Sequence, residues 1–296
     1  MIKKMRYKIL STRILLIALL LMVSGCQNNE STQSATQISN ETSSELSSEL
    51  SSELSSEVVT NPHSESTTEA IPQEEELLEI EHELWVKENA KDWDLGYAFI
   101  DYVGNNRDYD WYIDQAHTGE HSNDNCGPAS VTMAIKWADA SFSKTAEEAR
   151  KKYITSGGWW TTDEIADYLD DYAIEYTFFD MPVETKDDNI RTIMSIIDSG
   201  NIALACTEMK YIPLNDTEDT RVNRFYEFDS GHFFIIKGYA IVDNNTYFEV
   251  YDPNNWDETY ADGALKGKDR FYEANTVVDA ISYWWPYVFS IYPENE

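Results

Sequence analysis

The 296-residue chain carries 54 acidic and only 22 basic residues, which gives a formal net charge of −32 at pH 7. A surface of that sign repels a phosphate backbone, so we expect no nucleic-acid partner. The three cysteines include no CxxC pair, which disfavours a structural zinc site, and we expect neither a metal nor a cofactor.

The first 25 residues have the layout of a secretory signal. Basic residues between positions 3 and 13 precede an unbroken apolar run from Ile14 to Val23, which is too short to span a bilayer comfortably. The run ends in Val23-Ser24-Gly25-Cys26, which resembles the lipobox of bacterial lipoproteins. The resemblance implies a signal peptide over residues 1–25, a lipid on Cys26, export, and anchoring to the outer face of the bacterial cell membrane. The alternative is an ordinary signal peptide followed by an unrelated cysteine.

The next segment is predicted to be a tether. Residues 27–71 consist mostly of Ser, Thr, Glu and Asn and contain a Ser-Ser-Glu-Leu repeat from Ser43 to Glu57. This composition buries too little apolar surface to offset chain entropy, and the repeat has no heptads for a coiled coil. We therefore expect a disordered tether over residues 26–78. Residues 79–296, rich in Trp, Tyr and Phe, are expected to form one domain that is a monomer.

Within this domain the predicted helices precede most of the strands. The lead-in to about residue 112 favours a short helix around Leu84 and Trp85. Further helices are predicted at residues 126–138, 145–153, 161–172 and 189–200, the second and third from Thr-x-x-Glu capping boxes. Strands are predicted at residues 202–206, 231–239 and 247–252, and a last helix or strand within residues 276–292. Residues 207–228 are expected to form a loop that borders a cleft, and the order predicts an α+β fold.

Cys126 is the first candidate for chemistry. It lies in Asn125-Cys126-Gly127-Pro128-Ala129-Ser130, where polar residues give way to an apolar helical run. The polar residues from 123 to 125 are good N-cap types, and the backbone N–H groups of a helix start favour thiolate over thiol. The alternative is a small buried apolar residue, because free cysteines are usually buried. Cys206 fits a buried strand, and a Cys126–Cys206 disulfide is also open to an exported protein.

A thiol nucleophile needs a base and a third group that orients the base. His232 begins one predicted strand and Asp252 ends the next, so a hairpin would bring both to one end of the sheet. Their even separation is compatible with a shared face if no bulge intervenes. His232 also fits an ordinary strand-end histidine, and Asp252 followed by proline also fits a turn. Asn254 or Asn255 is an alternative orienting group.

Together, these segments resemble the C39-like branch of papain-fold cysteine peptidases. The resemblance rests on four stretches: Asp114-Gln115, residues 126–130 with Met133, Gly231-His232-Phe233 with Gly238-Tyr239, and Tyr251-Asp252-Pro253. It implies a papain-like cysteine peptidase fold. In that fold, an N-terminal helical half with the cysteine at a helix start packs on an antiparallel sheet that carries the histidine and the aspartate.

Carried over to these positions, the resemblance implies a role for each residue. Cys126 would be the nucleophile, His232 the general base and acid, and Asp252 the group that orients the imidazole. Gln115 would donate to the oxyanion beside the Cys126 backbone N–H. The Gln-to-Cys spacing is longer than in relatives that process leader peptides, so Asn123 or Asn125 is an alternative donor.

The expected function is hydrolysis of a peptide or other amide bond through an acyl-enzyme, with a peptide or protein as substrate. Acyl transfer on the same chemistry is one alternative. A non-catalytic lipoprotein that binds peptide, glycan or a host component through the same cleft is the other.

Other motifs remain open at this stage. The pairs Trp159-Trp160 and Trp284-Trp285 fit either the core or a groove for glycan or peptide. His117 and His121 are predicted to be solvent-facing loop residues. The polar clusters at residues 243–245 and 252–257 lack the periodicity of a calcium-binding loop.

Overall fold

The computed structural model describes residue 95 and residues 99–294. The predicted signal peptide, Cys26, the tether and the expected helix around Leu84 lie outside the described residues. The α-helices are α2 (Cys126–Ala138), α3 (Ala146–Lys152), α4 (Thr162–Asp171), α5 (Lys186–Asp198) and α6 (Ala274–Ile281). The strands are β1 (Phe99–Gly104), β2 (Tyr176–Asp180), β3 (Ile202–Glu208), β4 (Gly231–Val242), β5 (Asn245–Tyr251), β6 (Arg270–Glu273) and β7 (Tyr287–Ile291). Among the described residues, no helix has the length and apolar character needed to cross a bilayer.

The strands form one antiparallel sheet in the order β2-β7-β3-β4-β5-β6, with β1 paired to β4. The predictions of β3, β4 and β5 are confirmed, and the tail contains both a helix, α6, and a strand, β7. The sequence did not reveal β1, β2 or β6. The four residues of β6 are too few for a clear alternating pattern, and β2 is largely exposed.

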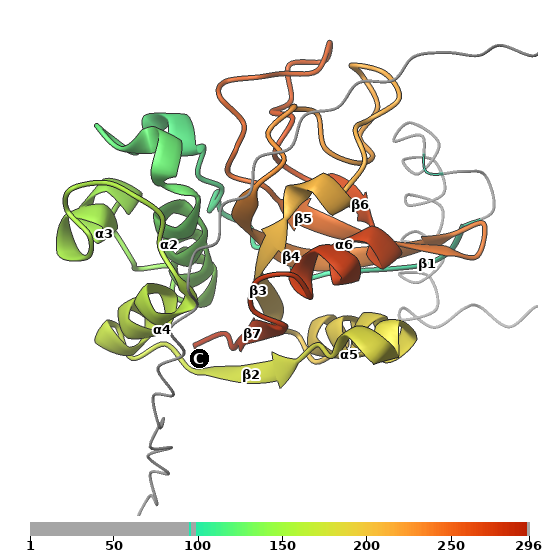
Figure 1. The fold of residues 1–296 in the computed structure, drawn as a ribbon, viewed down its shortest axis with the longest axis horizontal. Coiled ribbons are helices and arrows are strands. Elements are labelled where there is room, and N and C mark those ends of the chain that lie inside the picture. Colours follow the sequence, from blue (N-terminus) through green and yellow to red (C-terminus); the bar gives the residue numbers. More distant parts are fainter. Residues whose placement is uncertain (1–94, 96–98, 295–296) are drawn as a thin grey trace, which may run out of the picture. The chain divides into compact units, whose positions relative to one another are not determined.

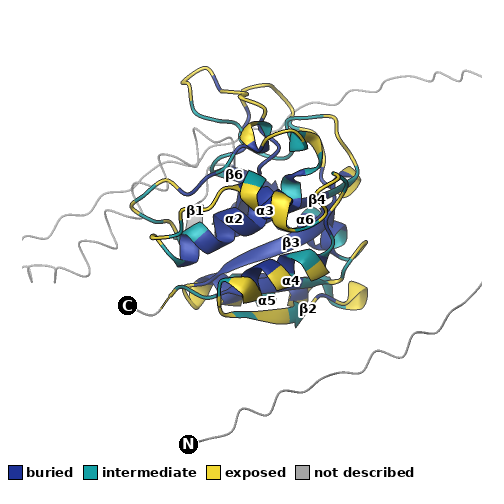
Figure 2. Ribbon diagram, turned by 90° about the vertical axis from the view of Figure 1, so that its left-hand side faces the viewer, coloured by how far each residue is buried: buried dark blue, intermediate teal, exposed yellow. Residues whose placement is uncertain are grey.

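Helices cover both faces of the sheet. The predicted helical half, α2 to α4, packs on the face that presents Ile202, Leu204 and Ile235. Helices α5 and α6 pack on the opposite face, which presents Ala203, Phe234 and other apolar residues. Figure 1 shows α2, α3 and α4 together on one side of the domain, and Figure 2 shows the buried core running through α2 and β3. The expected α+β arrangement is confirmed, while the second helical layer was not foreseen.

Local helix signals correspond well to the structure. Thr145 with Glu148 and Thr161 with Glu164 both form the predicted capping boxes, at the starts of α3 and α4. The prediction of α2 is confirmed over residues 126–138. Asn125 occupies the N-cap position, but its side chain makes no capping hydrogen bond.

A β-bulge determines which face of the sheet His232 and Asp252 share. Next to the turn at residues 243–244, Val242 pairs with Asn245, and this register continues to Gly238 and Glu249. If it continued further, Asp252 would lie opposite Ile235, on the face away from His232. The register shifts by one residue between Ile236 and Gly238. Asp252 then falls opposite Phe234, on the same face as His232. His232 and Asp252 therefore share a face, as the sequence predicted. The prediction assumed that no bulge lies between them, and this assumption was wrong, because the bulge is what brings them to one face.

Candidate active site

Cys126 is the first residue of α2 and is half-buried beside β4. Two residues that follow it place the start of the helix. A Cβ atom on Gly127 would lie 3.0 Å from the Cβ of Trp160, so the glycine allows a close approach to the segment that precedes α4. Ser130 Oγ donates to the carbonyl of Phe233 at 2.9 Å. The hydroxyl therefore fixes the thiol-bearing helix next to His232.

The loop before Cys126 is held by buried polar contacts. Asn125 is fully buried, and its Nδ2 donates to the carbonyl and to the hydroxyl of Thr118, both at 3.0 Å. Its Oδ1 accepts from Nε of the buried Arg150 at 2.6 Å, and the same guanidinium donates to the Asp124 carbonyl. These bonds occupy the Asn125 side chain, which explains why it caps nothing. Because both N–H groups of the Asn125 amide donate to Thr118, neither is free to bind the oxyanion.

His232 lies between Cys126 and Asp252. Its Nε2 is 2.8 Å from Asp252 Oδ1, and the two side chains are only 2% and 0% exposed. The imidazole also lies near the Cys126 side chain, and each group shifts the pKa of the other. Since Nε2 faces the carboxylate, Nδ1 is the nitrogen that remains for the thiol. The structure thus brings the three residues predicted from the sequence together in one chain of contacts.

Asp252 is held by four groups. Its Oδ2 accepts from the hydroxyls of Tyr226 at 2.7 Å and Tyr272 at 2.5 Å. Its Oδ1 accepts from His232 and from the backbone N–H of Asn254 at 2.9 Å. Neither tyrosine was predicted from the sequence, because both reach the carboxylate from segments distant in the chain.

The two asparagines proposed as alternative orienting groups lie elsewhere. Asn254 Oδ1 accepts from the indole N–H of Trp256 at 2.6 Å. Asn255 donates through Nδ2 to Asp114 at 3.0 Å and accepts at Oδ1 from the Gly267 N–H. The Asn254 side chain therefore binds within the loop, and the Asn255 side chain joins the loop to Asp114 and Gly267.

The three groups shift each other's proton affinity. Burial raises the pKa of Cys126, but the hydrogen bond and positive charge of His232, with the N–H groups of Phe233 and Gly127, outweigh it and lower the pKa below its usual range. Burial lowers the pKa of His232, but the Asp252 charge and hydrogen bond, with Cys126, raise it to about 10. Burial raises the pKa of Asp252. The charge and hydrogen bond of His232 and the two tyrosine hydroxyls outweigh burial, so the pKa lies below its ordinary value. At neutral pH the arrangement favours a thiolate, an imidazolium and a carboxylate.

Gln115 lines a cavity of about 400 Å³ with a mostly apolar surface, and Cys126 and His232 line the same cavity. The Nε2 of Gln115 donates to the Ser122 carbonyl at 3.1 Å, and its buried Oε1 has no hydrogen-bond partner among the described residues. The second N–H of the amide remains available to a group bound in the cavity. Asn123 is exposed and lines the same cavity, so its amide offers a second donor there.

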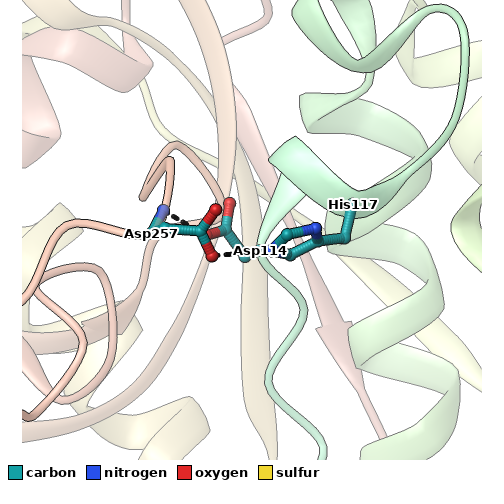
Figure 3. A group of neighbouring side chains, drawn as sticks. All are labelled: Asp114, His117 and Asp257. Atoms are coloured by element: carbon teal, nitrogen blue, oxygen red, sulfur yellow. Dashed lines mark hydrogen bonds and ion pairs between the residues drawn. The ribbon is translucent and has the colours of Figure 1, made fainter.

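Asp114, His117 and Asp257 form a cluster near this cavity, with potential ligand atoms within 4.8 Å of one another (Figure 3). The Asp114 carboxylate already accepts four hydrogen bonds, from the N–H groups of Ala116, Trp256 and Asp257 and from the Asn255 amide. A cation would have to replace these donors. The cluster is therefore best described as a clasp between the Gln115 segment and the loop that follows Asp252.

The two loop histidines and Cys206 differ in burial. His117 is exposed as expected and forms an ion pair of 2.7 Å with Asp257, whereas His121 is half-buried. Cys206 is buried in β3 as expected. Both cysteines are free, so the disulfide considered from the sequence is absent between them.

Comparison with known proteins identifies the family. The model of the peptidase C39-like family matches residues 109–277, more than half of the chain, and the protein belongs to this family. The matched range contains Gln115, Cys126, His232 and Asp252, and membership implies a cysteine peptidase.

The chain is also similar to solved structures at low sequence identity. Among curated proteins no match was found. Among solved structures, the chain is similar to a C39-like peptidase from Bacillus anthracis (13% identity, 67% of this chain and 100% of that chain, TM-score 0.41). It is also similar to digestive procathepsin L 3 (13% identity, 72% and 79%, TM-score 0.38) and procathepsin L2 proteinase (14%, 69% and 72%, TM-score 0.35) of the Tenebrio molitor larval midgut.

Proposed function

We propose that the protein is a thiol hydrolase that cleaves a peptide or other amide bond through an acyl-enzyme on Cys126. The observation that carries the proposal is the position of His232, which shares a cavity with Cys126 and hydrogen-bonds Asp252 at 2.8 Å. A buried histidine placed between a thiol and a carboxylate can move a proton between the nucleophile and the substrate. A protein that only binds its ligand has no physical need for this set.

The reaction follows from these contacts. The Cys126 thiolate attacks the carbonyl carbon, and the oxyanion that forms accepts from the Gln115 amide and the Cys126 backbone N–H. The His232 imidazolium gives its proton to the leaving nitrogen as the C–N bond breaks, which leaves a thioester and a free amine. Water then attacks the thioester, His232 takes one of its protons, and a carboxylic acid leaves while the thiolate is restored. Asp252 stays ionised and holds the imidazole in position.

An activity-based thiol electrophile tests the proposal on the soluble domain. We expect rapid labelling of Cys126 at neutral pH in the wild type and in Cys206→Ala, none in Cys126→Ala, and a large loss of rate in His232→Ala. Peptide hydrolysis should follow the same order. Equal labelling of wild type and His232→Ala would contradict the proposed pair. An added amine that appears in the product would indicate acyl transfer instead of hydrolysis.

We also propose that the domain works on the outer face of the membrane, attached through a lipid on Cys26 and the tether that follows. The support is in the sequence: basic residues, a short apolar run, and small residues directly before Cys26. In bacteria that express the full chain, we expect radiolabelled fatty acid on the protein and partition into detergent. Cys26→Ala should lose both. A Cys26→Ala protein that still carries fatty acid would refute the anchor without bearing on the chemistry at Cys126.

A further inference from the structure

The carboxylate of Asp252 is fully buried, and half of its hydrogen bonds come from groups that the proposed reaction does not use. His232 and the N–H of Asn254 bind Oδ1, whereas the hydroxyls of Tyr226 and Tyr272 bind Oδ2. Among the described residues, His232 is the only ion-pair partner of this carboxylate. A buried charge is costly unless its oxygens are hydrogen-bonded, so the two phenols do for Oδ2 what the other two donors do for Oδ1.

The two tyrosines lie on neighbouring segments that are hydrogen-bonded to each other. One is on β6, and the other is in residues 221–228, which run beside that strand. The N–H of Phe271 donates to the carbonyl of Arg221 at 2.9 Å, and the N–H of Asn223 donates to the carbonyl of Phe271 at 2.7 Å. One hydrogen-bonded unit therefore presents both hydroxyls to Oδ2.

Two arginines fix the backbone of residues 221–228. Arg224 donates to four backbone carbonyls at 2.7–3.3 Å, those of Ile212, Tyr226, Glu227 and Phe228. Arg270 is fully buried and donates to the carbonyls of Val222 and Asn223 and to the hydroxyl of Tyr260. Both guanidinium groups thus hold the segment that carries Tyr226, which gives its hydroxyl a fixed position.

The same segment covers the imidazole of His232. The ring centroids of Tyr226 and Phe228 lie 6.2 Å and 6.3 Å from the centroid of the imidazole, which is only 2% exposed. Water that reached the pair of His232 and Asp252 would compete for the oxygens of the carboxylate. Its exclusion strengthens both the hydrogen bond and the interaction of the two charges.

We propose that Tyr226 and Tyr272 are positioning residues for the reaction at Cys126. Their hydroxyls fix Oδ2 of Asp252, so that Oδ1 stays directed at Nε2 of His232. This step rests on the proposed function, since it assumes that Asp252 orients the histidine that serves Cys126.

The hydroxyls act on the carboxylate in two ways of opposite sign. They draw charge away from Oδ1, which weakens its bond to His232, and they keep the carboxylate from turning, which preserves that bond. A hydrogen bond depends steeply on its distance and angle, so the fixed orientation is the larger effect. Loss of a hydroxyl should therefore let His232 lose its proton at lower pH.

Other titratable groups around the pair do not mask this effect. Asp252 is faced by His232 on β4, by the two tyrosines, and by Tyr112, whose hydroxyl donates to the Asp252 main-chain carbonyl at 2.7 Å. Burial and the Asp252 charge raise the pKa of all three tyrosines well above its ordinary value. The hydroxyls therefore keep their protons, and Cys126 is the group that faces His232 on its other side.

The test uses the full-length chain and the variants Tyr226→Phe, Tyr272→Phe and the double variant. Each substitution removes one oxygen and keeps the ring. The alkylation rate of Cys126 by iodoacetamide would be followed by mass spectrometry of its peptide between pH 4 and 10.5. In the wild type, the plateau should end where His232 loses its proton, near pH 10. This end should move down by about 0.5–1 pH unit in either single variant, and by more in the double variant.

Tyr239→Phe is the matched control. The Tyr239 hydroxyl also donates to an aspartate, Asp198, at 2.8 Å, and Tyr239 is buried on β4 like His232. This variant loses the same kind of hydrogen bond, but at an aspartate that does not contact His232. In urea titrations it should be destabilised by about as much as Tyr226→Phe, and its plateau should end at the wild-type pH.

The outcomes separate the two proposals. A wild-type Cys126 with no plateau and with ordinary thiol reactivity would overturn both the proposed function and the positioning role. If the wild type has the plateau but the tyrosine variants lose only stability and keep its alkaline end, the positioning role is wrong while the thiol chemistry stands. A shift to higher pH would overturn the positioning role as well, because it would show that the hydroxyls act only by drawing charge from the carboxylate.

Discussion

Replacing His232 with alanine tests the electrostatics of the site most directly. In the wild type, burial opposes ionisation of Cys126, and the hydrogen bond and charge of His232 overcome it, with help from two backbone N–H groups. Asp252 maintains that charge by raising the pKa of His232 to about 10 despite burial. Without the imidazole, burial still raises the pKa of Cys126, and the interaction that lowers this pKa most is lost. The Cys126 thiol should then keep its proton at neutral pH.

The size of the effect follows from the thiolate fraction. An ordinary cysteine with a pKa of about 8.5 is about 0.3% thiolate at pH 6, so a fully ion-paired cysteine contains up to about 300 times more thiolate. A less basic thiolate is also less nucleophilic, which cancels roughly half of this gain on a logarithmic scale. We therefore expect alkylation by iodoacetamide at pH 6 to be about 10- to 20-fold slower in His232→Ala.

The assay is the alkylation rate of Cys126 between pH 4 and 10, with Cys126→Ala as the background from Cys206. That background should be small, because burial raises the pKa of the Cys206 thiol. In the wild type, the rate should rise with pH through the lowered pKa of Cys126 and then stay level until His232 loses its proton near pH 10. In His232→Ala the rise should move to higher pH. Coincident curves for the two proteins would refute the ion pair.

Three further changes have distinct expected results. Asp252→Asn removes the charge that raises the pKa of His232. The alkaline end of the plateau in the alkylation rate should therefore move down from near pH 10, and kcat should fall by about 100-fold or more. An alkaline end that does not move would count against this role of Asp252. Gln115→Ala should lower kcat for amide hydrolysis by about 100-fold or more but leave alkylation unchanged, because alkylation forms no oxyanion. Asn123→Ala is its control, and a larger loss there would transfer the oxyanion role to Asn123. Asp114→Ala orphans four donors and should lower the free energy of unfolding by about 2–4 kcal/mol in urea titrations, whereas wild-type stability would show that the clasp contributes little.

Features built from neighbouring residues could be predicted from the sequence. The capping boxes at Thr145 and Thr161 need only a glutamate three residues later, and both are formed. Cys126 at a helix start, His232 at the beginning of a strand and Asp252 after the next strand follow from equally local patterns. The order of helices and strands was therefore correct for most of the domain. Short strands such as β6 were missed, because their pairing and not their own pattern defines them.

The tertiary structure decided what depends on residues far apart in the chain. Tyr226 and Tyr272 reach Asp252 from loops and strands that no sequence spacing connects to it. The bulge that turns His232 and Asp252 to one face lies at Lys237, whose buried ammonium is held by Glu249 at 2.8 Å and by Asp269 at 2.7 Å.

The tryptophan pairs show the same division. The sequence established two pairs of large apolar rings, each suited to a core or to a groove. In the folded chain Trp160 is buried and Trp285 is half-buried, whereas Trp159 and Trp284 are exposed. All four line one cavity of about 140 Å³ beside Cys126. Local sequence determines which elements form and which chemical groups they carry. Only the packing of distant segments determines which groups meet, because contact depends on position in the fold and not on distance along the chain.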